Sequence, residues 1–128
     1  RNEEEKPFEI IRIPLPPMII TQVKPKDPIY RFYQKLKFQD GTILDGKSSF
    51  KMILAASYCN FIMTNGLVLL PYYYREGRLK LLEKTDRQAK EILQKVFPDR
   101  KVIQVDVDEI NREGGGMHCI SQQQPKIL

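Results

Sequence analysis

An Asn65-Gly66 pair between two apolar runs is the feature that most restricts how this chain can fold. A type I′ turn needs positive φ at both central positions, and asparagine and glycine tolerate this conformation best. The pair therefore predicts a hairpin between a strand at residues 58–63 and a strand at residues 67–73. The second strand is almost entirely apolar, which is typical of a strand that is covered on both faces.

A helix and a further strand are expected after this hairpin. Apolar residues recur at helical spacing through residues 85–97 and form one face, with Thr85 or Asp86 available to cap the first turn. Pro98 ends the helix, and residues 101–107 alternate as a strand does. A hairpin, a helix and a returning strand make a ββαβ unit, so the sequence predicts an α+β fold.

The N-terminal part of the chain gives weaker signals. Residues 8–13 alternate and are rich in isoleucine, which predicts a strand that ends at Pro14. The likeness of this run to residues 101–107 suggests an internal repeat whose first copy is truncated. Residues 18–23 are apolar enough to form a short extended piece.

Residues 24–54 are the least regular stretch. They contain two prolines and two glycines, and we interpret them as a divergent loop or insertion. Within this stretch, residues 29–38 are compatible with either a short helix or a strand. A chain of 128 residues is the size of one modest domain, so residues 1–128 are expected to form a single domain.

Charge and hydropathy bound the possible partners. The net charge of +5 comes from 21 basic and 16 acidic residues that are interleaved, which favours a mixed basic surface over a nucleic-acid site. A small nucleic-acid binder stays as a rival, motivated by the pI near 9.2 and the tyrosines. No apolar run approaches the roughly 18 residues of a membrane span. We therefore expect a cytoplasmic protein without a membrane partner, processed or cut from something longer because it begins with Arg1.

The two cysteines, Cys59 and Cys119, are far apart and form no Cys-x-x-Cys motif. With a single histidine in the chain, no metal site is expected, and a reducing compartment fits best. Cys59 lies in the predicted first strand of the hairpin and is expected to be a buried small hydrophobe. Its neighbour Asn60 either donates a hydrogen bond into a site or ties down a turn.

Cys119 follows a run of three glycines, residues 114–116, where the backbone can approach a ligand closely. Residues 117–121 are expected to form a last strand, which would place His118 on the face opposite to Cys119. Spacing alone favours a buried cysteine after a glycine-rich turn. The alternative is a nucleophilic thiol. A nearby positive group or a bound cationic substrate would raise its fraction of thiolate, the reactive form of cysteine.

The run GGGMHCISQQQP at residues 114–125 resembles the terminal catalytic motif of agmatine deiminases and bacterial peptidylarginine deiminase-like proteins. The run ASYCNF at residues 56–61 resembles the stretch that precedes this motif, and FPDR at residues 97–100 resembles a helix end between them. The resemblance covers most of residues 8–125, and residues 24–54 match least.

The resemblance implies a partial pentein, or α/β-propeller, with about two of the family's five ββαβ modules present. Cys119 aligns with the family's nucleophile, which attacks a guanidinium carbon, releases ammonia and leaves an amidino-cysteine that water hydrolyses. The backbone of Gly115 and Gly116 would line the site near the substrate. Neither a metal nor an organic cofactor is implied.

The family's histidine base and guanidinium-binding carboxylates belong to modules that this chain lacks. His118 matches the histidine of the motif itself, and neither Asp106 nor Asp108 sits in a matching motif. We therefore expect the C-terminal part of an enzyme that hydrolyses agmatine to N-carbamoylputrescine. The remainder of the enzyme, a complementary chain or self-association would complete it. A peptidylarginine or arginine deiminase fragment, or a non-catalytic partner-binding pentein fragment, are the alternatives.

Overall fold

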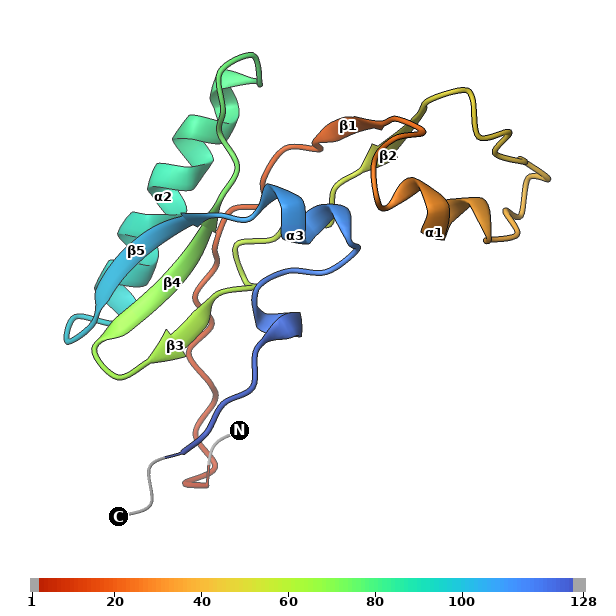
Figure 1. The fold of residues 1–128 in the computed structure, drawn as a ribbon. Coiled ribbons are helices and arrows are strands. Elements are labelled where there is room, and N and C mark those ends of the chain that lie inside the picture. The colour runs from red at the N-terminus through yellow and green to blue at the C-terminus, as the bar shows by residue number, and fades with distance from the viewer. Residues whose placement is uncertain (1–2, 126–128) are drawn as a thin grey trace.

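The computed structural model describes residues 3–125, and Figure 1 shows its arrangement. A three-stranded sheet with one long helix forms the main body, and a separate two-stranded sheet lies beside it (Figure 1). In chain order the elements are β1 (Ile20–Val23), α1 (Tyr30–Gln34), β2 (Phe50–Ile53), β3 (Ile62–Thr64), β4 (Leu67–Tyr72), α2 (Lys80–Val96), β5 (Lys101–Asp106), α3 (Asp108–Arg112) and the 3₁₀ turn η1 (His118–Ile120). None of the helices in this described part is long and apolar enough to cross a bilayer.

The predicted hairpin is confirmed, with its turn at the Asn65-Gly66 pair. Strands β3 and β4 pair antiparallel, with Thr64 opposite Leu67. Gly66 adopts a φ of 77°, the left-handed conformation that glycine tolerates best, but Asn65 has no positive φ, so the expected type I′ geometry of the turn is wrong. The first strand is shorter than predicted, because residues 57–60 form a turn before the paired segment begins.

The ββαβ unit is also confirmed. Strand β4 lies in the centre of the sheet, antiparallel to β3 and parallel to β5, with helix α2 as the crossover between β4 and β5. Val68 and Leu70 are fully buried, and every other residue of β4 is at least partly buried. The expectation of a strand covered on both faces is therefore correct.

Helix α2 begins at Lys80 rather than at residue 85, so the predicted cap is wrong. Thr85 and Asp86 lie inside the helix and are buried. These residue types usually cap helices because their side chains bond to free backbone N–H groups, and here they bond to other partners. The Thr85 hydroxyl, for example, lies 2.8 Å from the Tyr58 hydroxyl.

The carboxylate of Asp86 joins helix α2 to the end of β4 and to the turn before β3. It accepts hydrogen bonds from the Tyr58 hydroxyl at 2.7 Å and from the backbone N–H groups of Tyr73 at 3.0 Å and Tyr74 at 2.8 Å. Burial raises the pKa of Tyr73 to about 12, with a further contribution from the negative charge of Asp86. Burial likewise raises the pKa of Tyr58, so its hydroxyl stays protonated and donates to Asp86, while the Tyr73 hydroxyl donates to the carbonyl of Ser57.

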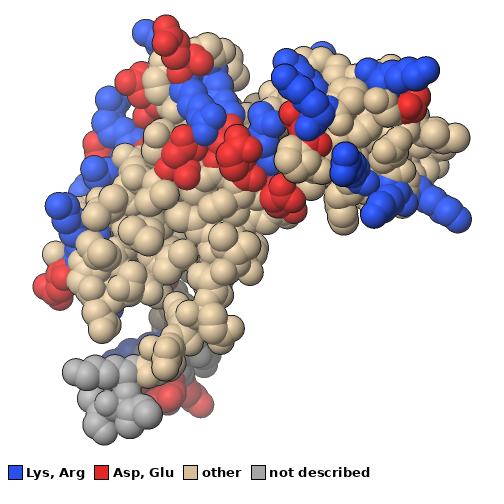
Figure 2. Space-filling model, in the orientation of Figure 1, with Lys and Arg blue, Asp and Glu red and all other residues tan. Residues whose placement is uncertain are grey.

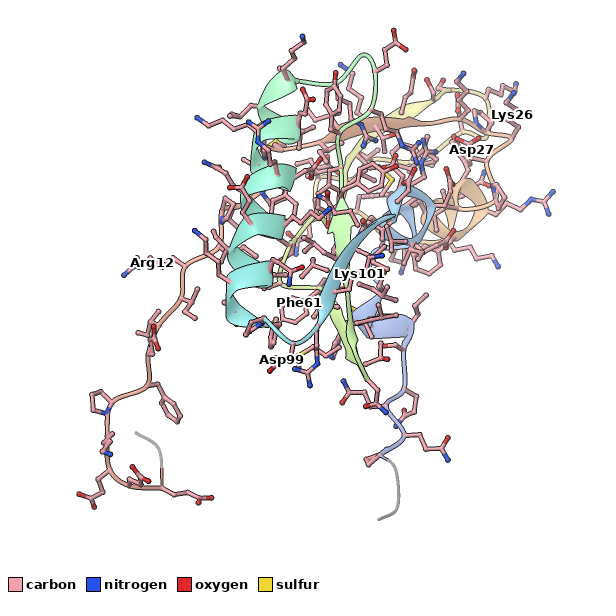
Figure 3. The ribbon with its side chains drawn as sticks, turned by 90° about the vertical axis from the view of Figure 1, so that its left-hand side faces the viewer. Arg12, Lys26, Asp27, Phe61, Asp99 and Lys101 are labelled. Atoms are coloured by element: carbon pink, nitrogen blue, oxygen red, sulfur yellow. The ribbon has the colours of Figure 1, made fainter. Side chains whose placement is uncertain are left out.

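The predicted strand at residues 8–13 is wrong. This segment is extended but pairs with no strand, and its apolar side chains before Ile13 face solvent, with Phe8 67% and Ile10 79% exposed, whereas Ile13 packs against the main core. Figure 3 shows Arg12 on this segment. Near Arg12 the segment lies beside α2, and toward the N-terminus it extends away from the main body of the protein. An alternating sequence forms a strand only where a neighbouring strand can pair with its backbone. Residues 8–13 have no such neighbour, so the suggested internal repeat lacks its first strand.

Residues 24–54 are not wholly irregular. Strands β1 and β2 pair antiparallel, with Val23 opposite Phe50, and the open choice for residues 29–38 resolves as helix α1. This small lobe has its own apolar cluster, centred on Val23, Ile29 and Tyr30. Lysine and arginine side chains gather over the lobe in Figure 2, and residues 24–54 contain seven basic against three acidic residues.

We predict that Asp86→Ala lowers the free energy of unfolding by about 3 kcal/mol, because two buried donors and one partly buried donor lose their acceptor. Urea denaturation followed by circular dichroism measures this change. Glu91→Ala, an exposed change on the same helix, is the matched control and is expected to stay within about 0.5 kcal/mol of the wild type. Equal denaturation midpoints for the two variants would contradict the role given to Asp86.

Candidate active site

Cys119 lies in the 3₁₀ turn η1, not in a strand, so the predicted last strand at residues 117–121 is wrong. Its backbone N–H donates to the carbonyl of Gly116 at 3.1 Å, which closes the turn. Met117 is the residue of this segment that inserts into the main core, with 5% exposure. Cys119 itself is exposed, so the expectation of a buried cysteine is also wrong and its thiol is open to solvent.

Asn60 contacts the Cys119 turn at two points. Its Oδ1 accepts a hydrogen bond from the backbone N–H of His118 at 2.7 Å. Its Nδ2 donates to the Sγ of Cys119 at 3.4 Å, within range for a sulfur acceptor. Both roles considered for Asn60 are therefore present, because its side-chain amide stabilises the turn at His118 and also donates to the thiol.

The pKa of the Cys119 thiol is lowered from its usual value. Backbone hydrogen bonding at Gly116 is the larger cause, and the Asn60 amide is the second. Both stabilise the negative charge of a thiolate. The arrangement therefore provides an accessible sulfur that ionises more readily than an ordinary cysteine, which is what nucleophilic chemistry needs.

The three glycines before Cys119 differ in their backbone conformation and in the space available for a side chain. Gly114 has a φ of 87° and lets the chain reverse after α3. A side chain on Gly115 would approach the Cβ of Cys119 at 3.4 Å, an ordinary contact. A side chain on Gly116 would overlap the amide of Asn60. The third glycine is therefore required by the side chain that holds the thiol.

Asn111 is a supporting residue that the sequence did not reveal. It lies in α3, is fully buried, and donates from Nδ2 to the carbonyls of Gly115 at 2.6 Å and Ala55 at 2.9 Å. These bonds join the glycine run to the segment that leads into the turn at residues 57–60. An asparagine in a short polar run carries no pattern that distinguishes this role from a solvent-exposed one.

Cys59 is exposed, which corrects the expectation that it is a buried hydrophobe. It lies in the turn at residues 57–60 and not in the paired strand, so its side chain has no sheet face to cover. Its backbone N–H donates to the Ser57 hydroxyl at 3.2 Å.

Asp106 and Asp108 are paired with arginines of the same chain. Arg75 contacts both oxygens of Asp106 at 2.7 Å, and Arg78 forms a two-pronged pair with the buried Asp108. Burial alone would raise the pKa of Asp106, but the Arg75 guanidinium and the backbone N–H of Asp108 together lower it. Because these carboxylates already form ion pairs with arginines of the same chain, their role is to stabilise the structure at the end of β5. Among residues 3–125, no group of three His, Cys, Asp or Glu side chains is placed to hold a metal ion.

Comparison with known proteins assigns this chain to a family. The model of the Porphyromonas-type peptidyl-arginine deiminases matches residues 1–125. The chain belongs to this family.

The relatives include enzymes named for agmatine. An agmatine deiminase from Pseudomonas fluorescens is 29% identical over 125 residues, which is 98% of this chain and 29% of that protein. The structure of "Agmatine deiminase of Enterococcus faecalis catalyzing its reaction" is 35% identical, has a TM-score of 0.50, and is matched over 83% of this chain and 25% of its own. The chain thus spans less than a third of the length of these relatives.

A further crystal structure is 20% identical and matches 97% of this chain and 26% of its own, with a TM-score of 0.59. At this identity the likeness concerns the fold alone. Together with the ββαβ unit described above, it shows that this family member is an α+β protein and part of a pentein. The fold class predicted from the sequence is therefore confirmed.

We predict that Gly116→Ala destabilises the chain by about 2 kcal/mol, because the new methyl group and the Asn60 amide need the same space. Gly115→Ala is the matched control, since its methyl group meets Cys119 at an ordinary distance, and it is expected to cost less than about 1 kcal/mol. Urea denaturation of both variants checks this. If Gly115→Ala were the more damaging change, the close approach of Asn60 to Gly116 would be wrong.

Proposed function

We propose that this chain is the C-terminal, catalytic-cysteine portion of a cytoplasmic guanidine deiminase that hydrolyses agmatine to N-carbamoylputrescine and ammonia. The single observation that carries the proposal is the exposed Cys119 thiol, whose pKa is lowered and whose sulfur is held by Asn60. Membership of the deiminase family and the agmatine deiminases among its relatives support the reaction and the substrate. Two free thiols suit a reducing compartment.

The proposed reaction is covalent catalysis in two stages. The Cys119 thiolate adds to the central carbon of the guanidinium, and the C–N bond to a terminal nitrogen breaks as that nitrogen takes a proton and leaves as ammonia. The product of this stage is an amidino-cysteine. Water then adds to the same carbon and gives up its protons to a base supplied from outside this chain, the C–S bond breaks, and the ureido product leaves while the sulfur returns as thiolate. Gly115 and Gly116 are proposed to line the site beside the substrate, and no metal or cofactor enters these steps.

Two further roles have to come from outside this chain. A proton must be delivered to the leaving ammonia, and carboxylates must hold the cationic guanidinium. Asp106 and Asp108 are engaged by Arg75 and Arg78, which leaves them unsuited to a second guanidinium. We propose that the remainder of the enzyme, a complementary chain or a second copy of this chain supplies these groups.

A closely related alternative concerns the substrate. The family model is named for peptidyl-arginine, so the same cysteine chemistry can serve a peptidylarginine or arginine deiminase. All three substrates share the guanidinium group that Cys119 would attack, and they differ at the far end. Comparing turnover of agmatine, arginine and an arginine-containing peptide by the full-length enzyme separates these alternatives.

A non-catalytic, partner-binding fragment is a second candidate function. The observation that favours it is the row of exposed apolar side chains on the N-terminal segment, with Leu15 78% and Met18 65% exposed in addition to Phe8 and Ile10. Such a row is typical of a surface that another chain covers. A mass that rises with concentration in light scattering supports this candidate, and a monomer at high concentration contradicts it.

We predict that Cys119→Ser reduces ureido-product formation from agmatine by the full-length enzyme at least about a thousandfold, because a serine hydroxyl is hardly ionised at neutral pH. Cys59→Ser is the matched control, since Cys59 is also an exposed thiol, and it is expected to keep wild-type turnover. A colorimetric assay for the ureido group measures both variants. Turnover that survives in Cys119→Ser would remove Cys119 from the mechanism.

The 128-residue chain is tested in the same assay. No product is expected, because the chain lacks the carboxylates and the proton donor that the reaction needs. Product that disappears in Cys119→Ala would show instead that this chain, or its self-assembly, supplies those groups.

A further inference from the structure

We propose that Asn60 is a positioning residue for Cys119, holding the sulfur through Nδ2 and the backbone of the cysteine turn through Oδ1. The inference rests on the proposed function, because it assigns to the nucleophile a second residue from a different part of the sequence. Asn60 and Cys119 are 59 positions apart, so the contact is created by the fold and not by local chain geometry.

The orientation of the Asn60 amide follows from its two partners. The backbone N–H of His118 can only donate, so the amide atom 2.7 Å from it is the oxygen. The other amide atom, which faces the Sγ of Cys119, is then the NH₂ group. An NH₂ donor favours the anionic form of the sulfur, whereas an oxygen at the same place would repel it.

The position of the Asn60 side chain is fixed on both sides. Asn60 ends the turn at residues 57–60, donating its backbone N–H to the carbonyl of Ser57 at 3.2 Å. Within this turn, Tyr58 is anchored by its hydroxyl to Asp86. On the other side, the absence of a side chain on Gly116 creates the space that the Asn60 amide fills. The amide is therefore aimed at the sulfur by the main core of the protein.

The contact has a chemical use in the proposed reaction. A thiolate on a short exposed turn is free to rotate about its side-chain bond, and only one direction presents it to the carbon under attack. A donor on one side of the sulfur holds it in one rotamer and leaves its opposite side for the substrate. Asn60 does not need to touch the substrate to have this effect.

The test separates donation to the sulfur from support of the turn. Asn60→Asp has nearly the same shape and keeps an oxygen for the His118 N–H, but it replaces the NH₂ donor with an oxygen that repels the thiolate. Asn60→Ala removes both contacts. Both changes are made in a Cys59→Ser background, so that Cys119 is the one thiol present. The rate of alkylation by iodoacetamide is followed against pH by intact-protein mass, and thermal unfolding is recorded in parallel.

We expect Asn60→Asp to raise the pH midpoint of alkylation by about one pH unit. At pH 7 this slows the reaction by about threefold, because the greater nucleophilicity of a more basic thiolate offsets part of the lost ionised fraction. Asn60→Ala should move the midpoint in the same direction by less, while lowering the melting temperature more than Asn60→Asp does.

An unchanged alkylation profile in Asn60→Asp would overturn the proposal, because Asn60 would then only support the turn. The readout concerns the sulfur and not the reaction of the enzyme. A shifted profile together with full turnover in Cys119→Ser would therefore reject the proposed function and keep the contact. An unchanged profile together with loss of turnover in Cys119→Ser would reject the contact and keep the function.

Discussion

The hydrogen bonds of the buried Asp86 carboxylate are the interaction on which the arrangement of this protein depends. They fix helix α2 against the end of β4 and, through the Tyr58 hydroxyl, against the turn before β3. This turn ends at Asn60, which contacts the sulfur of Cys119. An acid in the middle of a helix is thus linked, through this turn and Asn60, to a thiol on another element. The cost of burying its charge is offset because strong donors surround it.

The charges of this chain are unevenly distributed, which matters because a positively charged protein repels a cationic substrate. A net charge of +5 disfavours a cationic guanidinium substrate if the charge lies near the site. Most of the excess belongs to residues 24–54, and Figure 2 shows the lysines and arginines gathered over that lobe. The part of this face where Figure 1 places η1 is largely uncharged. Local repulsion near Cys119 on this face is therefore weaker than the total charge suggests.

The sequence predicts well where short-range chemistry decides the structure. The hairpin at Asn65-Gly66 and the apolar face of α2 depend on neighbours along the chain, and both are confirmed, although the turn is not of type I′. The errors lie where distant partners decide. Residues 8–13 alternate like a strand but have no strand to pair with, and Asp86 resembles a cap until Tyr73 and Tyr74 are seen to be its partners. The residues that support Cys119, Asn60 and Asn111, act across more than fifty positions or through burial, which no local pattern encodes.

The interlocking of Asn60 and Gly116 also limits how this protein can change over time. A larger residue at position 116 is acceptable only if the residue at position 60 becomes smaller, and the sulfur then loses its donor. A side chain added at position 116 alone would clash with Asn60, and a smaller residue at position 60 alone would remove the donor to the sulfur. The two positions are therefore coupled. A single replacement at either one introduces a clash or removes a hydrogen bond. A double replacement that restores the packing still lacks the NH₂ donor to the sulfur. Selection on the thiol therefore also acts on Gly116, through the space that its missing side chain leaves for Asn60.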